Sequence, residues 1–412
     1  MRYFLYNVRK VIRLILFWGI RLLTFWIPKD PRLIVFGSWL GNYYCDNPKW
    51  FMLHVLKRGG FKCIWIGKKS VKGILPICED LKFAEQGSFS AAISLARAGT
   101  WVCCQSIDDD LSMMPWGGEK HLMINFWHGI PIKYIGALTP FNKVNPWINK
   151  FGDCVLRCAS LPPAWHSASS RVQSEVMPKD APLLFSKDKM LYSGTPRNDF
   201  LIKNLDNSEI KMVLKRKYSS LLGFNSDQKI VLYLPTWRRG TANVKSFYNL
   251  DDKSAMPWNA MLSKHNAVLI EKHHYRTYEE NPITRTSFCS IVIPAAMQAK
   301  IDVQELLLIT DVLISDYSGA YIDFGVMKRP IIHFAYDLED YKSKDSGLIY
   351  DFEQVVAGPI VTTFEALRSE VEAALISPTF KPAKEFSAVI EFEKGHACED
   401  ALEFIRKHHK IG

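Results

Sequence analysis

The residues best suited to chemistry stand where runs of apolar residues end. His128 follows the apolar run 122–126 and precedes a glycine, a proline and Lys133. A neutral imidazole at the end of a strand can take a proton from an incoming hydroxyl, and Trp127 and Lys133 would border the same cleft. Taken alone, however, a histidine at a strand end is more often a hydrogen-bonded structural residue than a base.

Positively charged side chains mark two further strand ends. Lys272, His274 and Arg276 follow one apolar run, and Thr236 and Arg238 follow another. Cations in a cleft would neutralise a diphosphate and the charge that develops on a leaving phosphate. The alternative interpretation is that these are solvated loop charges. No Asp-x-Asp pair stands at an obvious strand end, so the sequence predicts neither a catalytic metal nor another cofactor.

A turn of small residues follows the apolar run 312–315. It passes through Asp316, Ser318 and Gly319 into an expected helix over residues 321–327. A helix N-terminus offers free backbone N–H groups to a phosphate, Ser318 adds a hydroxyl, and Gly319 allows close approach. By itself, such a turn is better explained as a plain strand-to-helix turn with Ser318 as an N-cap. The GxxxxGK[ST] signature of a P-loop is absent.

A fourth motif, Gly194-Thr195-Pro196-Arg197-Asn198-Asp199, stands where the first half of the chain gives way to the second. Gly194 and Pro196 favour a turn, across which Arg197 and Asp199 could pair. We interpret this motif as structural, with a substrate-facing Arg197 as the alternative.

The elements that position these residues alternate between short β-branched or aromatic runs and longer helical stretches, which is typical of α/β proteins. A good helix start at Asn47-Pro48 and a stop at Gly59-Gly60 place one helix between the first two runs. We expect two Rossmann-like domains that face a cleft, with substrate at the carboxyl ends of the strands. The expected strands are 33–36, 62–66, 101–105, 122–126, 155–158 and 190–193, then 229–234, 267–271, 291–293, 312–315 and 331–334. The expected domains are 1–30, an amphipathic helix; 31–205, the first Rossmann-like domain; 206–375, the second Rossmann-like domain; and 376–412, C-terminal helices.

The first thirty residues read as a cationic amphipathic helix. The longest uncharged run, 14–20, is too short to span a bilayer, which needs ~20 apolar residues. Arginines and one lysine gather on one side, aliphatic residues lie opposite, and Trp18 and Trp26 suit the headgroup zone. We favour a helix that lies in the surface of an anionic membrane over one packed on the protein's own core.

Composition limits the remaining possibilities. The chain has 412 residues, 48% of them hydrophobic, enough for two cores. The formal net charge of +10 favours phosphorylated or anionic partners without choosing among them. Nine cysteines, an odd number without CxxC spacing, argue against a disulfide framework or zinc site and suit a reducing cytoplasm. We therefore expect a peripheral protein on the cytoplasmic face of the cell membrane.

Several ordered motifs resemble the CDP-glycerol glycerophosphotransferase family, enzymes of teichoic-acid and capsule polymer synthesis. The resemblance covers roughly residues 33–370, and a set of ordered motifs is far more specific than any single one. The matching segments are Asp46-Asn47-Pro48-Lys49, Trp127-His128-Gly129-x-Pro131-x-Lys133, Gly194-x-Pro196-Arg197-Asn198-Asp199, Tyr233-x-Pro235-Thr236-x-Arg238, Thr310 to Ser318, Asp323-Phe324, Pro330, Asp337-Leu338-x-x-Tyr341 and Gly358-Pro359.

The resemblance implies a GT-B-like fold with the CDP donor on the second domain and the acceptor approaching from the first. It makes His128 the catalytic base and His274 a second histidine near the donor phosphate, although that choice could slip by one to His273. Ser318 matches the first serine of the family's Asp-Tyr-Ser-Ser, a phosphate ligand. Gly319 replaces the second serine, so one possible hydroxyl contact is missing.

The function so implied is transfer of glycerol phosphate, or a related polyol phosphate, from CDP-glycerol to a hydroxyl of a lipid-linked or polymeric cell-surface glycan, with release of CMP. The alternative is a GT-B glycosyltransferase that uses a nucleotide sugar. A non-catalytic membrane-surface or nucleic-acid binder ranks lower, because its cations would form an exposed stripe with interleaved aromatics. We expect no nucleic acid among the partners.

Overall fold

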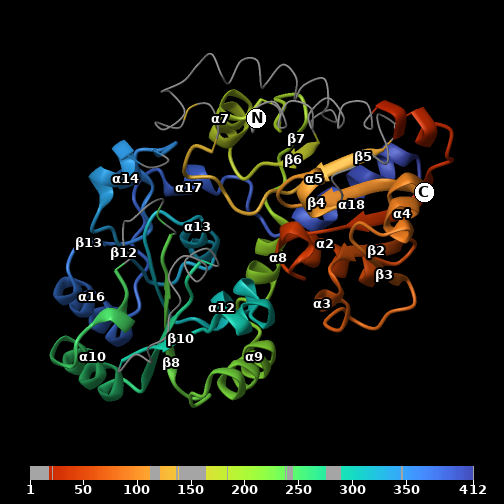
Figure 1. Ribbon diagram of the computed structural model, residues 1–412. Helices are drawn as coiled ribbons and strands as arrows, with labels where there is room; N and C mark the ends of the chain where they lie inside the picture. Colours follow the sequence, from red (N-terminus) through yellow and green to blue (C-terminus); the bar gives the residue numbers. More distant parts are fainter. Residues whose placement is uncertain are drawn as a thin grey trace, which may run out of the picture.

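Two parallel sheets, lying side by side, form the protein (Figure 1). The computed structural model describes residues 18–20, 22–111, 121–135, 138, 164–182, 184–236, 238, 245–274, 289–344 and 347–411, and every structural statement below concerns these residues. The expected strand 155–158 and the site residue Arg276 lie outside them.

The first sheet has seven parallel strands in the order β3-β2-β1-β4-β5-β6-β7. Alternate residues enter different apolar clusters, Ile34 and Phe36 on one face and Leu33 and Val35 on the other, so helices cover both faces. The strands are β1 (Asp30–Phe36), β2 (Lys62–Gly67), β3 (Leu81–Glu85), β4 (Ala98–Cys103), β5 (Leu122–Asn125), β6 (Trp165–Ser167) and β7 (Met190–Leu191). The helices among and after them are η1 (Trp39–Gly41), α2 (Asp46–Arg58), α3 (Lys69–Lys72), α4 (Phe89–Arg97), α5 (Ile107–Asp110), α7 (Arg171–Asp180) and α8 (Pro196–Lys203).

The second sheet has six parallel strands in the order β10-β9-β8-β11-β12-β13. Its residues likewise alternate between two clusters, for example Leu232 and Leu234 against Val231 and Tyr233. The strands are β8 (Lys229–Leu234), β9 (Ala267–Glu271), β10 (Ile291–Val292), β11 (Val312–Ser315), β12 (Ile331–Phe334) and β13 (Ile360–Val361). The helices are α9 (Ser208–Leu222), η3 (Phe247–Asn249), α10 (Asp252–Lys264), η4 (Ala295–Lys300), α12 (Val303–Ile309), α13 (Ala320–Gly325), α14 (Leu338–Lys344), α15 (Phe352–Val355) and α16 (Phe364–Ile376).

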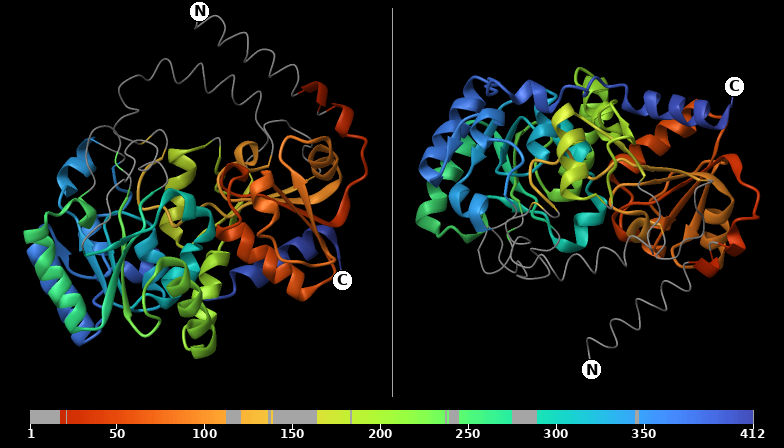
Figure 2. Two further views of the ribbon diagram at one scale, coloured as in Figure 1. Left: turned by 60° about the horizontal axis from the view of Figure 1, so that its bottom comes forward. Right: turned by 90° about the horizontal axis from the view of Figure 1, so that it is seen from above.

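The C-terminal segment crosses back from the second sheet to the first. Helix α16 packs on the second sheet through Leu367 and Val371, and α17 (Phe386–Val389) follows it. Helix α18 (Ala397–His409) then lies beside α2 (Figures 1 and 2). It buries Leu402 and Ile405 in the same apolar cluster as Phe51 of α2. The sequence predicted helices here but not this return, which gives the chain a second connection between the two halves besides that from α8 to α9.

Only the end of the expected N-terminal helix is described. Residues 18–20 and 22–24 are helical, and Leu22, Leu23 and Trp26 are exposed by 69, 75 and 79%. Thr24, on the polar side of the expected helix, is buried. Within the described residues, none of the helices has the length and apolar character needed to span a bilayer. Residues 1–17 and 21 lie outside the described part.

Candidate functional site

His128 stands in a loop that follows β5, defined here as the His128 loop (residues 126–130). Its Nδ1 lies 3.1 Å from the carbonyl oxygen of Cys104. Because a carbonyl oxygen only accepts, Nδ1 must carry a hydrogen, and in the neutral ring Nε2 then keeps its lone pair. Burial lowers the pKa of His128 to about 4, although Asp46 acts in the opposite direction. The imidazole is therefore neutral near pH 7, as a general base must be.

Trp127 does not border a cleft, contrary to the prediction. It is buried in an apolar cluster with Phe185 and Met177, and its carbonyl accepts a hydrogen bond from Asn47 Nδ2 at 2.8 Å. Its φ of 59° turns the chain sharply before His128. The indole is an anchor that fixes the His128 loop on the first sheet.

Arg197 connects the His128 loop to the second half of the protein. Its Nη1 donates to the carbonyl of His128 at 3.0 Å and to Asp46 Oδ1 at 2.9 Å, while Nη2 donates to Asp323 Oδ2 of α13. Burial lowers its pKa, but Asp323 and Asp46 more than offset this, so the guanidinium stays charged. The structural interpretation of this motif fits these contacts, whereas a substrate-facing Arg197 does not.

The expected pair between Arg197 and Asp199 does not form. Asp199 instead accepts hydrogen bonds from the backbone N–H groups of Ala397 and Cys398, at 3.0 and 2.9 Å. These contacts hold the first turn of α18. Arg197 and Asp199, two positions apart on α8, therefore contact different partners, because their side chains point to different sides of the helix.

The segment after His128 packs directly against the turn that contains Ser318 and Gly319. A Cβ atom placed on Gly319 would lie 2.9 Å from the carbonyl oxygen of Ile130. Three residues further on, Lys133 forms a β-bridge with Leu348, and Ile349 N donates to Ile132 O at 2.9 Å. The two motifs predicted to form the site thus meet at the junction of the two halves.

Ser318 lies half-buried before α13. Its Oγ accepts a hydrogen bond from Ala320 N at 3.3 Å, which leaves the hydroxyl hydrogen for another acceptor. Lys133 is near enough to His128 to depress its pKa further. The Ser318 hydroxyl and Lys133 therefore lie on the side where the two halves meet.

Arg238, Thr236 and Asp316 form a buried network instead of a diphosphate site. Asp316 accepts from Thr236 N, Thr236 Oγ1 and Arg238 Nη2, at 2.9, 2.6 and 2.9 Å. Arg238 also pairs with Asp337 through Nε at 2.7 Å and packs over the ring of Tyr317. With two carboxylates balancing one guanidinium, these contacts do not support the prediction that the three residues bind the donor phosphates. They fix the ends of β8 and β11.

The cationic segment after β9 divides into a buried and an accessible part. His273 is 1% exposed and its Nε2 lies 3.1 Å from Glu271 Oε2 and from Ser246 Oγ. His274 is half-buried. Lys272 Nζ donates to Gln298 Oε1 at 2.8 Å, and burial lowers its pKa to about 8, with Cys45 and Asp302 acting oppositely. Of the two neighbouring histidines, the accessible one is therefore His274.

Sequence reasoning did not single out Lys49 as a site residue. Its Nζ, on α2, pairs with Asp302 Oδ2 at 2.8 Å and Glu305 Oε1 at 3.1 Å, both at the start of α12. The same Asp302 also acts on Lys272, in the direction that raises its pKa. The signal was the Asp46-Asn47-Pro48-Lys49 motif, whose members hold the His128 loop, Arg197 and α12. No group of His, Cys, Asp and Glu in the described residues could hold a metal ion.

The fold and the site together define a GT-B-like α/β transferase: two parallel sheets, with a neutral imidazole at a strand end of the first and cations and a serine at strand ends of the second. The profile described as CDP-Glycerol:Poly(glycerophosphate) glycerophosphotransferase matches residues 20–405. The chain therefore belongs to the CDP-glycerol:poly(glycerophosphate) glycerophosphotransferase family and is an enzyme of that type. The nucleotide-sugar glycosyltransferase that the sequence left open is set aside.

Relatives with assigned functions agree with this membership. The chain is 26% identical to the "Teichoic acid poly(glycerol phosphate) polymerase" of Bacillus spizizenii, over 92% of each chain. It is 27% identical to the "Teichoic acid glycerol-phosphate transferase" of Staphylococcus aureus, over 82% of each. The solved structure of the wall teichoic acid polymerase TagF shares the fold, with a TM-score of 0.74 and 22% identity over 99% of this chain and 97% of that one.

Proposed function

We propose that this enzyme transfers glycerol phosphate, or a related polyol phosphate, from CDP-glycerol to a hydroxyl of a lipid-linked or polymeric cell-surface glycan and releases CMP. Two relatives named for glycerol-phosphate transfer support the choice of substrate. A solved TagF structure was obtained after a soak with CDPG, which supports a CDP donor. Relatives named for ribitol phosphate match over shorter spans, so glycerol is the first choice.

The proposal rests mainly on the protonation state and the position of His128. Its Nδ1–H faces Cys104 O, its Nε2 keeps a lone pair, and its loop packs against the Ser318–Gly319 turn. In the proposed step, the acceptor hydroxyl oxygen attacks the donor phosphorus that bears glycerol, and its proton passes to His128 Nε2. The bond from that phosphorus to the oxygen of CMP breaks, and CMP leaves with the electron pair.

Groups from the second half would stabilise the charge on the leaving phosphate. The candidates are His274, Lys272, the Ser318 hydroxyl and the backbone at Gly319. His274, Ser318 and Gly319 are partly exposed, and Lys272 donates a hydrogen bond to the neutral amide of Gln298. Fixed positive or N–H groups aimed at developing charge supply most of the rate in phosphoryl transfer.

We also propose that the enzyme works at an anionic membrane surface on the cytoplasmic side, where a lipid-linked acceptor is presented. The exposed Leu22, Leu23 and Trp26, together with the net charge of +10, support this. Binding to vesicles of phosphatidylglycerol and phosphatidylcholine should weaken in a Leu23→Glu, Trp26→Glu variant. Ile77→Glu, which alters a fully exposed apolar residue elsewhere, is the control.

The transferase proposal is tested by product analysis. Incubation with CDP-glycerol or CDP-ribitol and a lipid-linked acceptor should release CMP and add the mass of one or more polyol phosphates to the acceptor. A product that gains a sugar, or CMP release without any change in acceptor mass, would contradict the proposal.

A further inference from the structure

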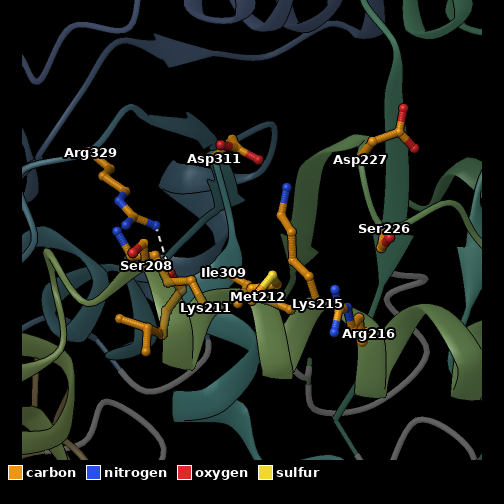
Figure 3. Close-up of a pocket in the computed structure, with 11 residues that line it drawn as sticks. Ser208, Lys211, Met212, Lys215, Arg216, Ser226, Asp227, Ile309, Asp311 and Arg329 are labelled. Carbon is orange, nitrogen blue, oxygen red and sulfur yellow. Dashed lines mark hydrogen bonds between the residues drawn. The ribbon is translucent and has the colours of Figure 1, made fainter.

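A second concave site lies at the opposite end of the second sheet from the candidate active site. It is a pocket of about 620 Å³, lined by α9 and by residues that precede strands of the sheet (Figure 3). Asp227 precedes β8, Asp311 precedes β11, and Arg329 precedes β12. The active-site groups follow the other ends of these strands, and β8 alone spans about 20 Å at ~3.3 Å per residue. The pocket is therefore separate from the active site.

Cationic side chains dominate this hollow, which we call the basic pocket. Three come from α9 and one from the turn before β12: Lys211, Lys215, Arg216 and Arg329. Within the described residues, no carboxylate oxygen lies within 4.0 Å of any of their nitrogen atoms. Lys215 Nζ donates to Gln228 O at 2.9 Å, and Arg329 Nη1 donates to Leu308 O and Thr310 O at 2.8 Å. Backbone carbonyls thus hold Lys215 and Arg329 in place, and none of the four cations pairs directly with a carboxylate of the described residues.

Each of the two acidic residues of the pocket accepts a hydrogen bond from a neighbour and makes no direct ion pair with the pocket's cations. Asp311 Oδ2 accepts the backbone N–H of Ile230 at 2.8 Å, and Asp227 Oδ2 accepts from Asn266 Nδ2 at 3.0 Å. Burial, which is the largest cause, and the nearby Arg329 lower the pKa of Lys211, while Asp206 and Asp311 act in the opposite direction without restoring it. An anion in the pocket would relieve this repulsion.

We propose that the basic pocket binds the phosphodiester groups of a polyol-phosphate chain, away from the site where the chain is extended. The identity of the chain rests on the proposed function. A volume of about 620 Å³ suits a short segment of such a chain, since ligand sites range over ~300–1,000 Å³. Lysine and arginine are the side chains that bind phosphate, and the Ser208 and Ser226 hydroxyls add neutral donors. A tethered chain would stay at high effective concentration near the enzyme.

A membrane lipid offers the same phosphodiester chemistry, but its position fits less well. The exposed apolar residues at 22–26 and helix α9 lie on different sides of the molecule in Figure 1 and in the left view of Figure 2. If residues 22–26 lay against a membrane, the basic pocket would face away from that membrane. The chain is therefore the ligand that we choose.

The test compares binding of a short synthetic poly(glycerol phosphate) oligomer to the full-length enzyme and to a Lys211→Gln, Arg216→Gln variant. Neither side chain makes a hydrogen bond to the described residues, so the fold should survive, which an unchanged Tm verifies. We expect at least tenfold weaker oligomer binding, a shallower salt dependence and unchanged CMP release with a lipid-linked acceptor. The Lys381→Gln, Lys384→Gln variant, which removes two exposed lysines outside the pocket, should bind like the wild type.

Two results would overturn the inference. The first is equal oligomer affinity of the pocket variant and the wild type. The second is loss of binding to phosphatidylglycerol vesicles with oligomer binding retained, which would make a lipid headgroup the ligand. Absence of CMP release by the wild type would refute the proposed function instead, and oligomer binding would still report on the pocket.

Discussion

The carbonyl oxygen of Ile130 lies 2.9 Å from the point where a side chain on Gly319 would begin. This contact joins the His128 loop of the first half to the turn before α13 in the second. Because the distance is shorter than real Cβ contacts allow, any side chain at position 319 must push the two segments apart. The Ser318 turn can therefore lie this close to the His128 loop only because Gly319 has no side chain.

The Gly319→Ala variant should therefore lose turnover while remaining folded. Small displacements between reacting groups cost rate steeply, so we expect kcat to fall by roughly 10- to 100-fold. Steady-state CMP release, with Tm measured in parallel, checks this. Gly73→Ala is the control, because a Cβ there meets nothing within 4 Å and its φ is −74°. Equal turnover of both variants and the wild type would show that the contact does not position the site.

Replacement of His128 tests the general base. His128→Ala should lower kcat at least ~100-fold, because a positioned base contributes about 10²- to 10⁴-fold to proton transfer. The measurement is single-turnover CMP formation at saturating CDP-glycerol, which separates chemistry from donor binding. His408→Ala, at an exposed position on α18, should act like the wild type. Near-normal turnover by His128→Ala would remove His128 from its role.

Most of the architecture could be predicted from sequence because strands and helices differ in hydrophobic period. The runs 229–234 and 267–271 coincide with β8 and β9, and the helix that was expected to start at Asn47 is α2. The short strands β3, β6 and β13 were missed, since a few residues of mixed polarity carry little periodicity. The return of α18 was missed because nothing local in a helix specifies its distant packing partner.

The candidate site was less predictable, because a charged residue type does not reveal its partner. Arg238 and Lys272 both follow strands and both looked like phosphate ligands. The first is balanced by Asp316 and Asp337, whereas the second donates to the neutral amide of Gln298. The difference depends on carboxylates brought in from 78 and 99 residues away. Such pairing depends on the fold, so the spacing of residues in the sequence does not reveal it.

Lys272 should give donor binding an alkaline limit. Burial lowers its pKa to about 8, while Cys45 and Asp302, which face it from the first half and from the start of α12, act in the opposite direction. As the pH rises through this value the ammonium loses its proton and its charge. KM for CDP-glycerol should then rise, by up to ~10-fold per pH unit, with a smaller effect on kcat.

The Lys272→Arg variant supplies the check, because arginine keeps its charge throughout this range. Its KM should be nearly constant between about pH 7.5 and 9.5, whatever its absolute value. Lys253→Arg, at an exposed position on α10, should retain the alkaline rise of the wild type. A rise in KM that persists in Lys272→Arg would assign the alkaline limit to another group.

The network around Asp316 should matter for stability more than for the chemical step. Its carboxylate is 1% exposed and pairs with Arg238 at 2.9 Å, so Asp316→Asn leaves a buried guanidinium with one carboxylate instead of two. Removal of one partner from a buried pair typically costs about 3 to 5 kcal/mol in free energy of unfolding, and the remaining Asp337 places the expected loss at the lower end. Urea denaturation measures it. Glu339→Gln, which breaks the exposed pair with Lys342, should leave the free energy of unfolding almost unchanged. A similar small effect of Asp316→Asn would mean that the network is dispensable, and Arg238 would again be a candidate for binding the donor diphosphate.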